Sequence, residues 1–181
     1  MKKRLAPLLL TLCLLLSGCG RNAAADRFAS FSQELRARSD LCFSAEVRAE
    51  YSDRSAHFLL RYEDDPPGCR VTALSPEEIR GVTVRLNGAQ SALGYDSVVL
   101  DTGPLDRYGL SPVSAMAKIA EALREGHLES AWEEGGLTVW ELVPDDEAAV
   151  LIWLDEDLLP QRAELVSEGR VTVFCEFREW K

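Results

Sequence analysis

The stretch LDEDLLPQRAELVSEGRVTVFCEF, residues 154–177, decides the fold class of this chain. It has the texture of two strands, the first beginning at Leu159-Pro160 and the second at Arg170. An Asp-Glu-Asp turn precedes the first strand and a Glu-Gly turn separates the two, and such residues are typical of chain reversals. The stretch therefore predicts an antiparallel hairpin at the end of the chain.

Strand texture continues from this hairpin towards the N-terminus. Apolar residues alternate from Phe43 to Tyr51 and again from Phe58 to Tyr62, which predicts another hairpin. Further strands are expected in residues 69–74, 79–88, 90–101, 127–134, 136–143 and 147–155. The pattern predicts a mainly β, α+β chain with one antiparallel meander of about eleven strands. The segment AAVLIWL, residues 148–154, is apolar on both sides, so something must cover each face of the sheet there, such as a helix or an enclosed apolar space.

Two segments have helical spacing instead. In residues 26–40, Phe28, Phe31 and Leu35 recur at helical intervals, and Asp26 stands where it can cap the first turn. This segment predicts a short amphipathic helix near the N-terminus.

The second helix is expected from Ser111 to Gly126. Ser111 stands at the cap position, Pro112 at the first helical position and Gly126 at the end. Its apolar face consists of Met116, Ile119, Ala120 and Leu123. This face either seals the core or forms the lid of an apolar pocket.

The N-terminus has the features of a secretory leader. A basic group, Lys2 to Arg4, precedes the apolar run Leu5–Leu16, which is too short to span a bilayer. The next residues, Leu-Ser-Gly-Cys ending at Cys19, resemble the lipobox of bacterial lipoproteins, in which the cysteine is acylated with chains such as palmitate. We therefore expect a signal peptide at 1–18, a lipidated tether at 19–25 and one domain at 26–181.

Net charge narrows the possible partners. The chain has 20 basic and 30 acidic residues. Removal of residues 1–18 takes away three bases, which leaves 17 against 30 and a charge of −13. This balance disfavours nucleic acid and offers no polybasic patch to anionic lipid. Attachment is expected through lipid on Cys19 to a bacterial cell membrane, outside the cytoplasm, in a host with one membrane or two.

Three cysteines would remain after processing. Cys42, Cys69 and Cys175 allow one intramolecular disulfide at most. The sequence is compatible with either one disulfide or three buried thiols.

The sequence has no catalytic motif that we recognise, such as Gly-x-Ser-x-Gly or a phosphate-binding loop. The acidic groups at 64–65, 145–147 and 155–157 fall at expected turns, where solvated side chains are usual. His57 and His127, the only two histidines, are expected at the surface. We expect no enzyme, no metal and no cofactor.

Several short features of the chain resemble the LolA-like family of bacterial lipoprotein carriers and receptors. They are Leu154-Asp155, Leu159-Pro160, Glu164 and Gly169 near the end, with Pro76, Ile79 and Gly81 earlier. The resemblance covers residues 26–181. It implies a sheet curved into a half-open barrel, with the N-terminal and mid-chain helices covering an apolar cavity.

Two functions follow from this resemblance. The first is an anchored lipoprotein that binds an acyl chain, lipid or lipopeptide between the sheet and the helix at 111–126. Residues expected at such a pocket are Met116, Ile119, Leu123, Trp140 and Trp153. The second is a filled-core adaptor or sensor domain that contacts another envelope protein and has no ligand pocket. The two differ in the empty volume beneath the helix.

Overall fold

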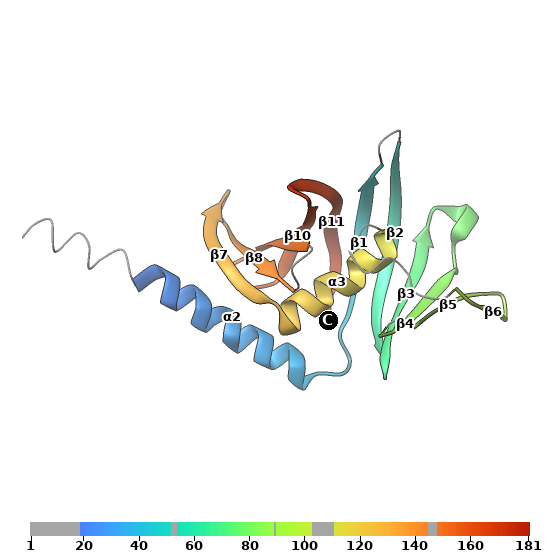
Figure 1. Ribbon diagram of the computed structural model, residues 1–181, viewed down its shortest axis with the longest axis horizontal. Helices are drawn as coiled ribbons and strands as arrows, with labels where there is room; N and C mark the ends of the chain where they lie inside the picture. The colour runs from blue at the N-terminus through green and yellow to red at the C-terminus, as the bar shows by residue number, and fades with distance from the viewer. Residues whose placement is uncertain (1–18, 52–53, 89, 103–110, 145–147) are drawn as a thin grey trace, which may run out of the picture.

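A computed structural model describes residues 19–51, 54–88, 90–102, 111–144 and 148–181. Within these residues, eleven strands form one antiparallel sheet that does not close, and two α-helices accompany it (Figure 1). The expected mainly β fold with about eleven strands and two helices is confirmed. The signal peptide expected at 1–18 lies outside the described residues.

The sheet consists of two meanders joined in the middle. Its order is β6-β5-β4-β3-β2-β1-β11-β10-β9-β8-β7, so only the pairing of β1 with β11 connects strands distant in sequence. In that pairing Val47 lies opposite Cys175. The strands are β1 (Cys42–Glu50), β2 (Ser55–Asp65), β3 (Gly68–Ser75), β4 (Thr83–Asn87), β5 (Gln90–Tyr95), β6 (Val98–Asp101), β7 (His127–Glu134), β8 (Leu137–Val143), β9 (Ala148–Leu154), β10 (Pro160–Ser167) and β11 (Arg170–Trp180).

The terminal hairpin forms as its turn residues predict. One carboxylate oxygen of Asp155 accepts the N–H groups of Asp157 at 3.0 Å and Leu159 at 2.9 Å, which orders the turn before β10. Gly169 has φ +72°, a left-handed conformation that glycine adopts readily, between β10 and β11.

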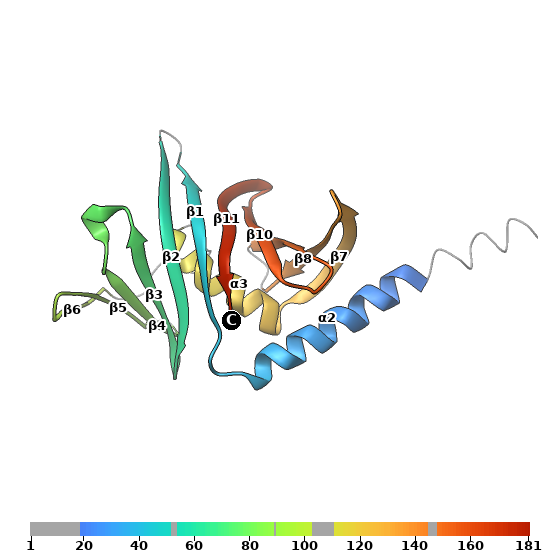
Figure 2. The same cartoon turned by 180° about the vertical axis from the view of Figure 1, so that it is seen from behind.

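Helix α3 (Pro112–Glu125) lies across one face of the sheet (Figures 1 and 2). The Ser111 hydroxyl accepts the Ser114 N–H at 3.1 Å, which confirms Ser111 as the cap. At the other end a Cβ on Gly126 would lie 2.4 Å from the Ala122 carbonyl oxygen, so glycine permits the chain to turn sharply into β7.

Helix α2 (Cys19–Ala37) begins seven residues earlier than Asp26, so the expected helix start with a cap at Asp26 is wrong. The lipidated tether expected at 19–25 stays a prediction. Three consecutive alanines, residues 23–25, are strong helix formers and favour this extension. Figure 1 shows the first turns of α2 projecting beyond the sheet. No helix of the described residues is both long enough and apolar enough to cross a membrane.

The core lies between α3 and the sheet face that it covers. Alternate residues of the central strands point to that face, as the strand period requires. The buried strand residues of this cluster include Phe43, Ala45, Val47, Leu60, Tyr62, Val71, Trp140, Leu142, Val150, Ile152, Leu154, Ala163, Leu165, Val173 and Cys175.

Candidate functional site

The apolar face of α3 is embedded in this core. Met116, Ile119 and Leu123 each have 0% exposure and belong to one hydrophobic cluster with the strands beneath them. Close packing of this kind leaves these side chains in contact with protein atoms. The three residues expected at a pocket thus have the position of core residues.

Trp140 of β8 joins the same cluster. Its side chain has 0% exposure, and its ring meets Phe28 and Phe31 of α2 edge-to-face, with centroids 5.4 and 5.5 Å apart. Helix α2 therefore packs over the indole, and the helical spacing of its aromatic residues is explained. Four of the five expected pocket residues come together here.

Trp153 lies on the opposite face of the sheet. Its neighbour Ile152 pairs with Trp140 and points to α3, so Trp153 must point away, because successive strand residues face opposite sides. There the Arg162 guanidinium covers the indole at 4.3 Å from its centroid, and Trp153 is 5% exposed. At Trp153, the outer side of β9 is thus covered in part by a cation–π contact.

A buried ion pair holds α3 to the sheet. The Arg124 guanidinium donates to both carboxylate oxygens of Asp64, at 3.0 and 2.6 Å. The same carboxylate accepts the Tyr62 hydroxyl at 3.1 Å and the Leu41 N–H at 2.9 Å. The Asp64 side chain is 7% exposed, so the expectation of a solvated turn carboxylate is wrong at this position.

The ion pair also connects the two helices. Arg124 Nε donates to the Leu35 carbonyl oxygen at 3.2 Å, and the Arg124 carbonyl oxygen accepts from Ser32 and Arg36 of α2. Burial raises the pKa of Asp64, but the hydrogen bonds from Arg124 and Leu41 outweigh it and hold that pKa below its ordinary value. We call the Asp64–Arg124 pair and its helix contacts the helix clamp. No sequence motif marks it, because its partners are 60 residues apart.

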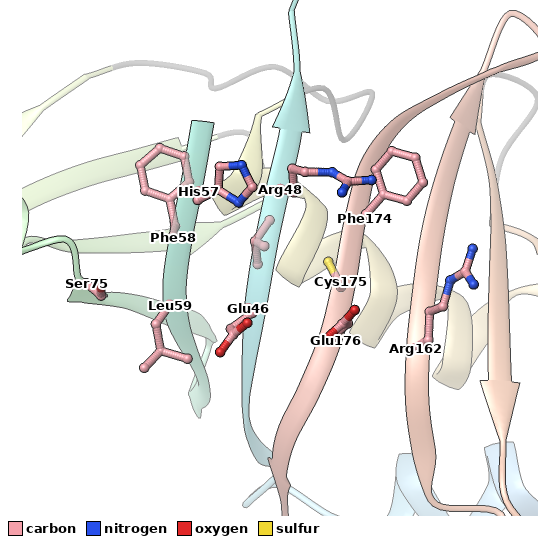
Figure 3. Close-up of a pocket in the computed structure, with 11 residues that line it drawn as sticks. Glu46, Arg48, His57, Phe58, Leu59, Ser75, Arg162, Phe174, Cys175 and Glu176 are labelled. Carbon is pink, nitrogen blue, oxygen red and sulfur yellow. The ribbon is translucent and has the colours of Figure 1, made fainter. Parts of the chain in front are cut away.

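A hollow of about 620 Å³ lies on the face of the sheet opposite α3, which we call the outer face; in Figure 3, α3 is seen behind the sheet. No short sequence pattern indicates it, because its lining comes from strands β1, β2, β3, β10 and β11. The lining residues are Glu46, Val47, Arg48, His57, Phe58, Leu59, Ser75, Arg162, Phe174, Cys175 and Glu176.

Charges in the hollow are largely paired. Arg48 covers the Phe174 ring at 4.3 Å and also meets Glu50 at 3.0 Å. Arg178 donates to Glu46 at 2.8 Å, and this hydrogen bond lowers the pKa of the Glu46 carboxyl. The arrangement is that of a solvated sheet face held by ion pairs. His57 is exposed at its rim, as expected.

Cys42, Cys69 and Cys175 are free thiols. Burial raises the pKa of Cys69 to about 11 and that of Cys175 to about 12, which disfavours the thiolate form that reacts. Among the described residues, no group of three or more His, Cys, Asp or Glu side chains could hold a metal ion.

Comparisons with known proteins give the fold a name. No protein-family model matches the chain, and no curated protein matches it significantly. A LolA superfamily protein from Nitrosomonas europaea has a similar structure, with 14% identity, a TM-score of 0.51 and coverage of 87% of this chain and 92% of the other. A putative outer membrane lipoprotein-sorting protein domain from Vibrio parahaemolyticus has 13% identity, a TM-score of 0.48 and coverage of 87% and 92%.

A third similar structure is the GerS lipoprotein with the CwlD amidase from Clostridioides difficile, with 12% identity, a TM-score of 0.45 and coverage of 86% of this chain and 94% of the other. At these identities the comparisons concern the fold alone. The open eleven-stranded sheet with its two helices is a LolA-like fold.

Proposed function

We propose that this protein is a lipid-anchored adaptor of the bacterial cell envelope. Lipid on Cys19 would hold it at the outer side of the cell membrane, and the surface of its domain would bind another envelope protein. The proposal assigns no catalysis. The observation that carries it is the filled interior: Met116, Ile119, Leu123 and Trp140 are all fully buried among protein atoms.

The free energy needed to open the space beneath α3 supports the adaptor over the lipid-binding function. An acyl chain beneath α3 would have to displace Met116, Ile119 and Leu123, and re-exposing such side chains costs about 1.5–3 kcal/mol each. The sum is comparable to the whole stability of a typical domain, about 5–15 kcal/mol. The helix clamp adds to this resistance, since Arg124 is the last-turn residue that ties α3 to Asp64.

The second candidate is binding of an acyl chain, lipid or lipopeptide. It is favoured by the apolar character of the sheet face beneath α3, because displacement of the helix would uncover one continuous apolar surface. In that case Met116, Ile119, Leu123 and Trp140 would contact the ligand. Trp153 would contribute only from the outer face.

The amount of lipid bound to the purified protein distinguishes the adaptor function from the lipid-binding function. The chain from Arg21 to Lys181 retains Phe28, Phe31 and Leu35, which pack α2 onto the domain, and it can be purified without detergent. Native mass spectrometry, lipid extraction and titration with a fluorescent fatty acid then measure occupancy. The adaptor proposal predicts a ligand-free mass and no saturable uptake.

Cross-linking with a photoactivatable fatty acid identifies where on the protein the fatty acid binds. Saturable uptake with cross-links on α3 or on the covered sheet face would overturn the adaptor proposal in favour of the ligand. Weak labelling spread over the outer face, where Trp153 lies, would match non-specific adsorption and leave the adaptor proposal standing.

A further inference from the structure

The β5–β6 hairpin exposes an unusual amount of apolar surface. Tyr95, Val98, Val99 and Leu100 are 53%, 59%, 66% and 57% exposed. They are four of the seven large hydrophobic side chains that are exposed among the described residues. Contiguous exposed apolar residues of this kind mark interaction sites in soluble domains.

This hairpin also forms an edge of the sheet. β6 is the last strand of the order, and within the described residues no strand pairs with its outer side. Edge strands are commonly protected from pairing by charged residues, proline or a covering element. The other edge, β7, fits that rule: it carries Glu129, Glu133 and Glu134, and α2 packs against it.

In contrast, β6 begins with Val98, Val99 and Leu100 and has a single charged residue, Asp101, at its end and no proline. Val98 and Leu100 lie on one face and Val99 on the other, because strand residues alternate. A strand added to this edge would therefore find apolar contacts on both of its faces.

A small hollow lies beside this edge. It measures about 220 Å³ and is lined in part by Thr83, Gly94, Tyr95 and Val99. Gly94 stands opposite Val99 in the β5–β6 register, and a Cβ there would approach the Thr83 hydroxyl to 2.8 Å. Without a Cβ, Gly94 lets Thr83 pack close to β5, and the hollow beside Val99 stays open to a side chain from an added strand.

Charge indicates what kind of strand would bind. Without residues 1–18 the chain has a charge of −13. Asp96 lies in the turn between β5 and β6, and Arg85, the basic residue that lines the hollow, is paired with Asp65 at 3.2 Å. A second copy would bring the same charge, whereas a basic segment would be attracted. We propose that β6 is the docking edge for an extended segment of an envelope protein, with alternating apolar residues and flanking Lys or Arg, which adds to the sheet as a further strand.

This inference rests on the proposed adaptor function and identifies its binding surface. The test uses the full chain, expressed with its own leader and purified in detergent micelles. The probe is the blocked peptide acetyl-Lys-Thr-Val-Thr-Ile-Thr-Lys-amide, with a peptide in which Glu replaces both Lys as the charge control. Titration gives affinity, and hydrogen–deuterium exchange gives the place of binding.

We expect saturable binding of the basic peptide and slower exchange of β6 amides. Val99→Lys should weaken binding at least about tenfold, since a loss of 1.4 kcal/mol corresponds to that factor. The side chain of Val99 is mostly exposed, so the variant should keep the unfolding midpoint of the natural chain. Trp132→Lys, at an exposed position on β7, is the matched control and should bind as the natural chain does.

Three results would overturn the docking edge: no saturable binding, protection outside β5 and β6, or equal affinity for the acidic peptide. A dimer in sedimentation that Val99→Lys abolishes would also overturn it, because a second copy would then be the occupant. The adaptor function fails by a different result, saturable lipid uptake beneath α3, so the two failures are distinguishable.

Discussion

Replacement of Arg124 by methionine removes the helix clamp and leaves the Asp64 carboxylate without its charged partner. The Arg124 and Asp64 side chains are only 17% and 7% exposed, so water cannot fully replace the lost hydrogen bonds. Removal of one partner from a buried ion pair typically costs about 3–5 kcal/mol. For a domain of this length we expect Arg124→Met to lower the melting temperature by at least about 6 °C, at 2–4 °C per kcal/mol.

The assay is urea unfolding followed by tryptophan fluorescence, with Arg38→Met as the matched control. Arg38 pairs with Asp40, whose side chain is 78% exposed, and an exposed pair contributes about 0–1 kcal/mol. Asp64→Asn combined with Arg124→Met should cost less than the sum of the single changes, because the pair is coupled. A loss of under about 1 kcal/mol in Arg124→Met would refute the clamp.

The same pair predicts a pH dependence. The pKa of Asp64 is lowered in the folded chain, so the stabilisation is present above the carboxyl's unfolded pKa of about 3.9 and is lost as pH falls through the lower folded value. The difference in unfolding free energy between the natural chain and Arg124→Met should therefore be full at pH 7 and shrink below about pH 4. A difference that stays constant down to about pH 2 would contradict this assignment.

Three further predictions concern the anchor, the core and the thiols. Cys19→Ala should move the protein from the membrane fraction to the soluble fraction with an unchanged melting temperature; continued sedimentation with membranes would show that Cys19 is not the anchor. Trp140→Ala should cost about 3–5 kcal/mol in urea unfolding and clearly more than Trp132→Ala, because the Trp132 side chain is 38% exposed; similar losses in both would contradict the packing of α2 over Trp140. A thiol reagent at pH 8 should label Cys42 in the folded protein and reach Cys69 and Cys175 only on unfolding, because the latter two are buried with pKa values raised to about 11 and about 12; equal labelling rates would count against their burial.

Local patterns were sufficient to predict most of the fold. The turn residues around Asp155 and Gly169, the alternation in β1 and β2, and the Ser111–Gly126 helix are all short-range signals, and the structure has each element. The start of α2 was misplaced, because Asp26 is a good cap by type but the alanines before it also favour helix.

The site was harder to predict because it depends on contacts distant in sequence. Helical spacing identified Met116 and Leu123, but only the packed sheet shows that these side chains are covered. Trp140 and Trp153 looked equivalent as aromatic residues of central strands, and the register of β8 with β9 separates them by face. In the sequence Asp64 has the context of a turn carboxylate, and only the structure shows that it pairs with Arg124 of α3.

Hydrogen exchange of α3 in the native protein tests the filled core most directly. If the helix is a core element, the amides of Met116 to Leu123 should exchange only through global unfolding, with the same free energy of opening as the amides of β1 and β11. If those helix amides instead exchange through a much smaller opening while β1 and β11 stay protected, α3 is a movable lid, and the filled-core account is contradicted.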